Sequence, residues 1–171
     1  MTTGTGVAAG RRLAGALCAA LLALAACTAD PKGDGVTAPP TPPIVDVSQA
    51  QKLVRGYADR VVAAVGDTTL RDPDETSPHC DEKPDDWYYF SGIYQILVPA
   101  ERQQDALKRV KAYAQTHGYT VKDENTFADR TGDITVLNPG DGVTFTLGSG
   151  EPPAMVLIIN SPCYRTDKPL P

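Results

Sequence analysis

The sequence predicts an α+β domain with a mainly antiparallel sheet of about five strands, two helices packed on one face of the sheet, and one disulfide. Two long segments carry apolar residues at intervals of three and four, the spacing of one helix face. Several shorter segments are rich in β-branched and aromatic residues and end near Gly, Pro, Asn or Asp, which is typical of strands. Cys80 precedes the first long predicted strand and Cys163 follows the last one.

The predicted helices cover residues 48–65 and 100–117. Apolar residues recur at helical spacing in the first helix: Ala50, Val54, Tyr57, Ala58, Val61, Val62 and Val65. Ser48 is its expected N-cap, and Gly66 is expected to end it. The second helix follows Pro99 and ends before Gly118, a residue expected just beyond a helix C-terminus. Its inner face is expected to carry Ala106, Leu107, Val110, Tyr113 and Ala114.

The longest predicted strand covers residues 87–98 and is apolar at both alternating sets of positions, as is the predicted strand 154–160. Strands that are apolar on both faces are usually central. Between them, residues 133–137 and 143–147 flank Asn138-Pro139-Gly140-Asp141-Gly142, a strong hairpin signal. Residues 119–122 are expected to form a short strand. The polar residues 67–86, which include three prolines, are expected to form a loop.

The N-terminal residues 1–26 have the composition of a signal peptide. Arg11 and Arg12 precede an uncharged apolar run over residues 13–26, which is too short to span a membrane. The run ends in Leu24-Ala25-Ala26-Cys27, which resembles the lipobox of bacterial lipoproteins. That resemblance implies that the Cys27 thiol receives a diacylglyceryl group and that the signal is cut just before it. The alternatives are an ordinary signal peptide with an incidental cysteine and, for the export route, a twin-arginine signal.

The rest of the chain divides into a tether, a domain and a tail. Residues 27–46 hold the lipidated cysteine and a Pro-rich segment with almost no large apolar residue, which is expected to be disordered. Residues 47–165 are expected to form a single α+β domain, and residues 166–171 a flexible tail. The layout resembles that of small lipoproteins of actinobacteria, which implies a lipid anchor at the extracytoplasmic face of the cell membrane.

An exported chain lies where disulfides persist. If Cys18 leaves with the signal and Cys27 carries lipid, Cys80 and Cys163 remain as the one intramolecular pair. The disulfide would bring the start of strand 87–98 near the end of strand 154–160, so we expect these strands to be antiparallel neighbours in the centre of the sheet. A reactive or metal-binding thiol is the functional alternative, which no C-x-x-C motif supports.

The net charge and the absence of known motifs limit which ligands and reactions we expect. The chain has 16 basic and 21 acidic residues and a net charge of −5, so no nucleic-acid partner is expected. The two histidines, His79 and His117, do not stand at H-E-x-x-H spacing, and Gly148-Ser149-Gly150 indicates a turn rather than a nucleophile elbow. Residues 72–86 are rich in carboxylates, which Ca²⁺ prefers, but lack EF-hand spacing. We therefore expect no metal, no cofactor and no enzymatic activity.

Three functions remain. The first is a non-catalytic module that binds a protein or another component of the cell envelope. Trp87 and Tyr89 are the candidate binding surface, because one set of alternating residues in their strand is exposed if no helix covers it. The second is a carrier of a small apolar ligand or lipid, which requires a cavity between sheet and helices. The third is an enzyme with an unrecognised site.

Overall fold

The computed structural model describes residues 41–66, 68–127 and 131–170. The helices are α1 (Val47–Val65) and α2 (Ala100–Thr116). The strands are β1 (Leu70–Thr76), β2 (Trp87–Tyr88), β3 (Ser91–Leu97), β4 (Thr120–Thr126), β5 (Gly132–Leu137), β6 (Thr144–Ser149), β7 (Ala154–Asn160) and β8 (Tyr164–Arg165). The predicted signal peptide, Cys27 and most of the predicted tether lie outside the described residues.

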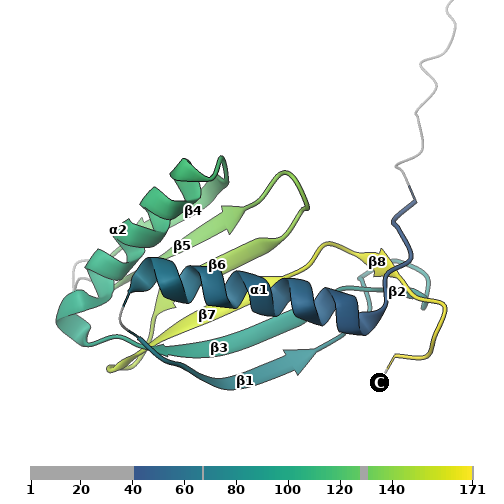
Figure 1. Cartoon of the computed structure of the whole chain (residues 1–171), viewed down its shortest axis with the longest axis horizontal. Coiled ribbons are helices and arrows are strands. Elements are labelled where there is room, and N and C mark those ends of the chain that lie inside the picture. The colour runs from purple at the N-terminus through teal and green to yellow at the C-terminus, as the bar shows by residue number, and fades with distance from the viewer. Residues whose placement is uncertain (1–40, 67, 128–130, 171) are drawn as a thin grey trace, which may run out of the picture. The chain divides into compact units, whose positions relative to one another are not determined.

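Six strands form one antiparallel sheet in the order β1-β3-β7-β6-β5-β4. The pairing of β3 with β7 confirms the prediction that the two most apolar strands are antiparallel neighbours. Both helices pack on the same face of the sheet (Figure 1), with α1 against β3 and β7 and α2 against β4 and β5. The α+β class is therefore confirmed, and the sheet has six strands where about five were expected.

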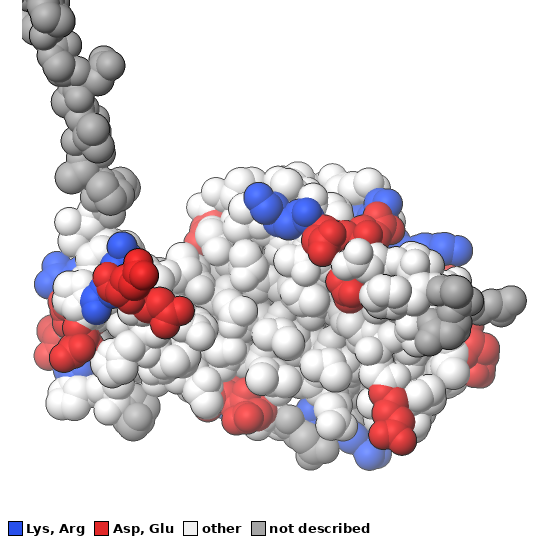
Figure 2. Space-filling model, turned by 180° about the vertical axis from the view of Figure 1, so that it is seen from behind, with Lys and Arg blue, Asp and Glu red and all other residues white. Residues whose placement is uncertain are grey.

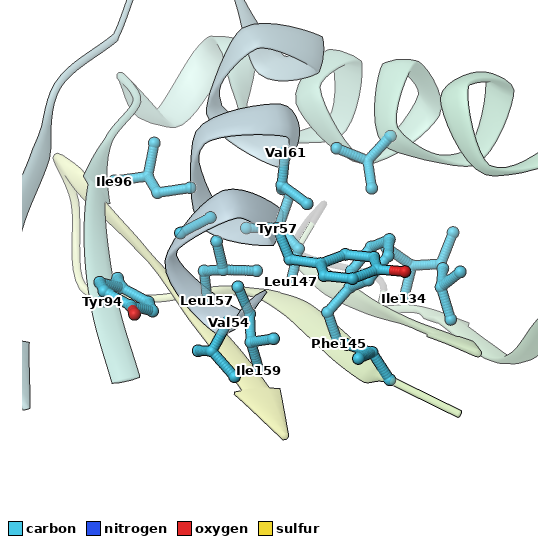
Figure 3. Packing of buried hydrophobic residues seen from close by; sticks show 14 of the residues in the cluster. Val54, Tyr57, Val61, Tyr94, Ile96, Ile134, Phe145, Leu147, Leu157 and Ile159 are labelled. Atoms are coloured by element: carbon cyan, nitrogen blue, oxygen red, sulfur yellow. The ribbon is translucent and has the colours of Figure 1, made fainter. Parts of the chain in front are cut away.

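The core lies between the helices and the sheet (Figure 3). In each inner strand, alternate residues point toward the helices and are buried. These side chains pack against α1, and Figure 3 labels several of them with three from that helix: Val54, Tyr57, Val61, Tyr94, Ile96, Ile134, Phe145, Leu147, Leu157 and Ile159. None of them is more than 1% exposed. Because the helices take up this alternating set, the other set faces away from them and is covered by neither helix.

The helix ends show one correction. The N-cap of α1 is Asp46, not Ser48. The Asp46 side chain accepts a hydrogen bond from the Ser48 backbone N–H (2.9 Å), and the Gln49 side chain accepts one from the Asp46 backbone N–H (3.4 Å). This reciprocal arrangement is a capping box, for which Gln49 was the sequence signal. Gly66 ends α1 as expected, with a φ of 94° that favours glycine.

Two predictions for the region before α2 were wrong. Residues 70–76, expected in a loop, form the edge strand β1. Their sequence lacks apolar alternation because an edge strand needs little burial, and Pro73 is tolerated at an edge. The predicted strand 87–98 is divided between β2 and β3, which belong to different sheets. At the division, Phe90 does not continue the β2–β8 ladder. Its backbone N–H donates to the Ser161 hydroxyl oxygen, and its carbonyl oxygen accepts from the Ser161 backbone N–H.

The C-terminal half also differs in detail. β4 runs to Thr126 and is longer than the predicted strand 119–122, because its pairing with β5 compensates for a polar sequence. β8 was not predicted, since two residues are too few to show a pattern. The predicted hairpin is confirmed: the Asn138 backbone N–H donates to the Val143 carbonyl oxygen (2.9 Å) between β5 and β6.

The small sheet of β2 and β8 adjoins the disulfide Cys80–Cys163, which confirms the predicted pairing. The first described residues of the chain, before α1, run alongside β8 and form hydrogen bonds with it. The Val45 N–H donates to the Arg165 carbonyl oxygen (2.9 Å), and the Arg165 N–H donates to the Pro43 carbonyl oxygen (3.0 Å). Lys168 forms an ion pair with Asp46 (2.6 Å). The end of the predicted tether is thus bonded to the domain beside its disulfide.

Candidate functional site

The face of the six-stranded sheet opposite α1 and α2 is the main candidate site, and we call it the open face. Its residues are the partly exposed set in each strand, between the buried positions. One row across it follows directly from the register of the strands: Asp74, Ile93, Ile158, Thr146, Thr135 and Asp123. This row crosses all six strands, from the β1 edge to the β4 edge.

The middle of the open face is uncharged. Over β3 and β7 it is largely apolar, with Ile93, Leu97, Val156 and Ile158, and Ile93 is 41% exposed. Over β5 and β6 it consists mainly of threonines, and the Thr135 and Thr146 hydroxyls are hydrogen-bonded to each other (2.9 Å). Figure 2, which views the molecule from the side opposite to Figure 1, shows a broad area without charged side chains, with acidic and basic groups around its margins.

The register places charged residues at the two edges of this face. Arg71 and Asp74 stand on β1 opposite Gln95 and Ile93. Asp123 stands on β4 and Asp133 on β5. Within the described residues, none of these four side chains forms an ion pair. The Asn125 amide bridges the two β4-side carboxylates, donating to Asp123 Oδ2 (3.1 Å) and Asp133 Oδ1 (3.2 Å).

One corner of the open face is hollowed. The hollow has a volume of about 400 Å³, and Leu97, Ala154 and Val156 are the apolar strand residues that line it. Arg71, Gln95 and the turn of residues 150–153 also line it. An apolar lining with a few polar groups is the kind of surface that receives a side chain of a partner.

The edges of the sheet are poorly suited to the addition of another strand. β1 contains Pro73, which lacks a backbone donor, and its register shifts between Arg71 and Asp74. β4 is charged, and its register shifts between Val121 and Asp123. Proline, charge and bulges are the devices that block edge-to-edge pairing. A partner therefore has better access to the open face than to the edges.

A second hollow, on the helix side, lies between α1 and β1. Its volume is about 620 Å³, and it is lined by Val47, Gln51, Glu75, Thr76, Ser77, Pro78 and Phe90. The Glu75 carboxylate accepts hydrogen bonds from Gln51 Nε2 (2.7 Å), from Arg55 Nε (2.8 Å) and Nη2 (2.6 Å), and from the Tyr94 hydroxyl (2.9 Å). The bonds from Arg55 are the main cause that lowers the pKa of Glu75 to about 2.

These contacts give Glu75 a structural role. A carboxylate offers about four acceptor positions, and the donors of α1 and β3 take them up. Burial, followed by the bond to Glu75, raises the pKa of the Tyr94 hydroxyl. Neither group is placed to exchange a proton near neutral pH. The cluster joins the N-terminal half of α1 to the edge strand β1.

The residues proposed from the sequence are dispersed. Trp87 lies in β2, with Lys83 Nζ 5.6 Å from its ring centroid, and Tyr89 lies between β2 and β3. Both are partly buried, and neither belongs to the six-stranded sheet. They were proposed as a binding surface because residues 87–98 were expected to form one strand, and the structure divides that strand in two. Their role in binding stays a prediction. Cys27 lies outside the described residues.

The open face was partly foreseeable. Both alternating sets of the predicted strand 87–98 are apolar, so the sequence did not show which set the helices cover. The threonines of residues 143–147 were the clearest signal, since they alternate with Val143, Phe145 and Leu147. His79 and His117 are not brought together with other ligands: within the described residues, no three His, Cys, Asp or Glu side chains gather as a metal site would need.

No protein-family model matches the chain, and no curated protein matches it in sequence. Among solved structures, it is similar to one described as "Crystal structure of the putative lipoprotein LppA from Mycobacterium tuberculosis", with 22% identity and a TM-score of 0.47. The similarity covers 72% of this chain and 82% of that one. A likeness at this level carries no conclusion about function. Over the part of the chain that the structure describes, we find no helix with the length and apolar character needed to cross a membrane.

Proposed function

We propose that this chain is an exported lipoprotein, anchored through Cys27 at the extracytoplasmic face of the cell membrane, and that it binds an envelope protein without catalysing a reaction. The resemblance of Leu24-Ala25-Ala26-Cys27 to a lipobox supports the anchor, as does the polar, Pro-rich segment that follows. More than one acyl chain holds a protein stably on a bilayer without a spanning helix. The domain would then stand at the end of a tether, free to meet a partner.

The observation that carries the binding role is the open face. The sheet face opposite α1 and α2 exposes apolar side chains of β3 and β7 next to an uncharged row of threonines. Contiguous apolar surface on a folded domain commonly marks an interaction site. Because the sheet edges are poorly suited to pairing, this face is the better surface of the sheet for docking.

A carrier of a small apolar ligand is the second candidate, and the hollow between α1 and β1 is the observation that favours it. Its volume of about 620 Å³ lies in the range of ligand sites. Gln51, Glu75 and Ser77 give it a polar wall, however, which suits an apolar ligand poorly. Native mass spectrometry of the exported protein would decide: a lipid that co-purifies, and that is lost in a Ser77→Trp variant whose side chain fills the hollow, would favour carriage over protein binding.

Photocrosslinking tests the binding role directly. A benzophenone amino acid is placed in the exported chain at Ile93 or Thr146, on the open face, and as a control at exposed Lys52 on α1. We expect one crosslinked envelope protein, identical from Ile93 and Thr146 and not obtained from Lys52. An additional Ile158→Lys substitution should abolish it. Crosslinks from Lys52 alone, or from none of the three positions, would contradict this function.

A further inference from the structure

We infer that the partner of the open face is a protein surface with an uncharged centre and basic groups on both sides of it. This inference rests on the proposed function and adds the chemical character of the partner. It comes from the row that the register defines across the sheet. Asp74 stands at one end of that row and Asp123 at the other. Between them lie only Ile93, Ile158, Thr146 and Thr135.

The spacing of the two carboxylates follows from sheet geometry. Five strand-to-strand intervals separate β1 from β4, and neighbouring strands lie about 4.8 Å apart, so the ends of the row are about 24 Å apart. A helix covers that distance with about 16 residues. The partner therefore needs its basic groups about that far apart, with uncharged side chains between them.

The charged residues around the margin of the open face support a partner of positive charge. Asp133 adds to Asp123 on one side, and Glu151 adds a carboxylate at the hollowed corner. Two basic residues stand near these carboxylates in the described part of the chain: Arg71 on β1 beside Asp74, and exposed Lys122, which the register shift of β4 leaves unpaired directly before Asp123. No ion pair within the described residues neutralises Asp74, Asp123 or Asp133. Charges of opposite sign at the rim of an interface speed association and exclude wrong partners.

The same pattern argues against two other occupants. A second copy of the chain, docked face to face with the two β4 margins together, would bring the carboxylates of Asp123 and Asp133 close to their own copies. An anionic lipid surface would be repelled by the β4 margin, where Asp123 and Asp133 stand, since like charges that approach within a Debye length of about 10 Å are only partly screened. A cationic protein surface meets neither obstacle.

The test uses two fluorescent helical peptides and the full chain carrying Cys27→Ser, so that no acyl chain takes part. Both peptides have the same uncharged, apolar middle; one ends in lysines about 18 residues apart, which puts both on one side of the helix at a separation of about 27 Å, and the other in glutamates at the same positions. We expect fluorescence anisotropy at low salt to show at least tenfold tighter binding of the lysine peptide. The preference should shrink as salt is raised. A scrambled lysine peptide should bind no better than the glutamate peptide.

Matched variants locate the effect. Asp74→Asn with Asp123→Asn should reduce the preference at least fivefold, whereas Asp81→Asn with Asp85→Asn removes the same charge from the exposed loop near Cys80 and should leave it unchanged. Ile158→Lys and, independently, Thr146→Lys should abolish binding. Circular dichroism of each variant confirms that it is folded.

The other outcomes separate the two proposals. Equal binding of both peptides, abolished by Ile158→Lys and Thr146→Lys, would overturn the inferred basic partner and leave the open face as the binding surface. Binding that neither variant weakens would overturn both proposals. No binding of the lysine peptide at 1 mM, roughly the weakest affinity of interest, would overturn the inference. Two further results would overturn the inference if the Ile158→Lys substitution abolished them. One is a dimer of the chain in sedimentation, and the other is flotation of the chain with phosphatidylglycerol vesicles.

Discussion

Replacing Glu75 with Gln should destabilise the domain in a manner that depends on pH. The change keeps the size of the side chain and removes the charge that Arg55, Gln51 and Tyr94 surround. The gap between the ordinary pKa of 4.5 and the value of about 2 corresponds to about 3 kcal/mol, at about 1.4 kcal/mol per pKa unit. Arg55 is 57% exposed, so water screens its attraction, and we expect a loss of about 1–2 kcal/mol at pH 7.

The pH dependence follows from the direction of the pKa change. The pKa of Glu75 is lower in the folded chain than in the unfolded chain, so its contribution is complete above about pH 5 and is lost as the pH falls toward 2. Urea unfolding followed by circular dichroism at pH 7 and pH 3 measures this. The difference between the original chain and Glu75→Gln should fall by more than about half at pH 3.

The control is Glu101→Gln, which removes an exposed carboxylate without an ion pair among the described residues and should change stability by less than about 0.5 kcal/mol. A loss in Glu75→Gln that is the same at both pH values would show that the residue acts through packing. No loss at either pH would show that the cluster does not stabilise the fold.

Four other changes have expected results of their own. Leu157→Ala, at a fully buried position, should lower the free energy of unfolding by about 2–5 kcal/mol in urea, whereas Val156→Ala on the open face should lower it by less than about 1 kcal/mol. Replacing both Cys80 and Cys163 with Ala opens a loop with a sequence separation of 83, and thermal unfolding should report a loss of about 4.5 kcal/mol; an unchanged midpoint would refute this. Gly118→Ala should cost about 1 kcal/mol because φ is +71°, although no atom lies within 4 Å of the added methyl group. Cys27→Ser should move the exported chain from the membrane fraction to the soluble fraction; retention on membranes would contradict lipidation.

The helices and strands that the sequence predicted correctly are those in which the spacing of apolar residues indicates the buried face. α1 and α2 show it at intervals of three and four, and β3 and β7 as apolar runs that reach the centre of the sheet. Asp46 was missed as the N-cap because Ser48 is also a good capping residue, and only the chain direction before α1 distinguishes the two. β1 was missed because its order depends on a neighbouring strand and not on its own composition.

The site was less predictable than the fold. Trp87 and Tyr89 stood out as aromatic residues, yet β8 and the disulfide hold this part of the chain in a separate small sheet. Glu75 looked like one carboxylate among many in an acidic loop. Its partners lie 19 to 24 residues away in the sequence, on α1 and β3.

The sequence by itself determined the helices, the apolar strands, the cysteine pair and the lipobox-like segment, because each of these depends on residues that are close together or on a simple count. Only the tertiary structure decided which side of the sheet the helices cover, and therefore which side chains face outward. It also decided that Asp74 and Asp123, far apart along the chain, stand in one row across that face. Strand order and register join such residues through backbone hydrogen bonds, which are the same for every sequence and leave no pattern of their own in it.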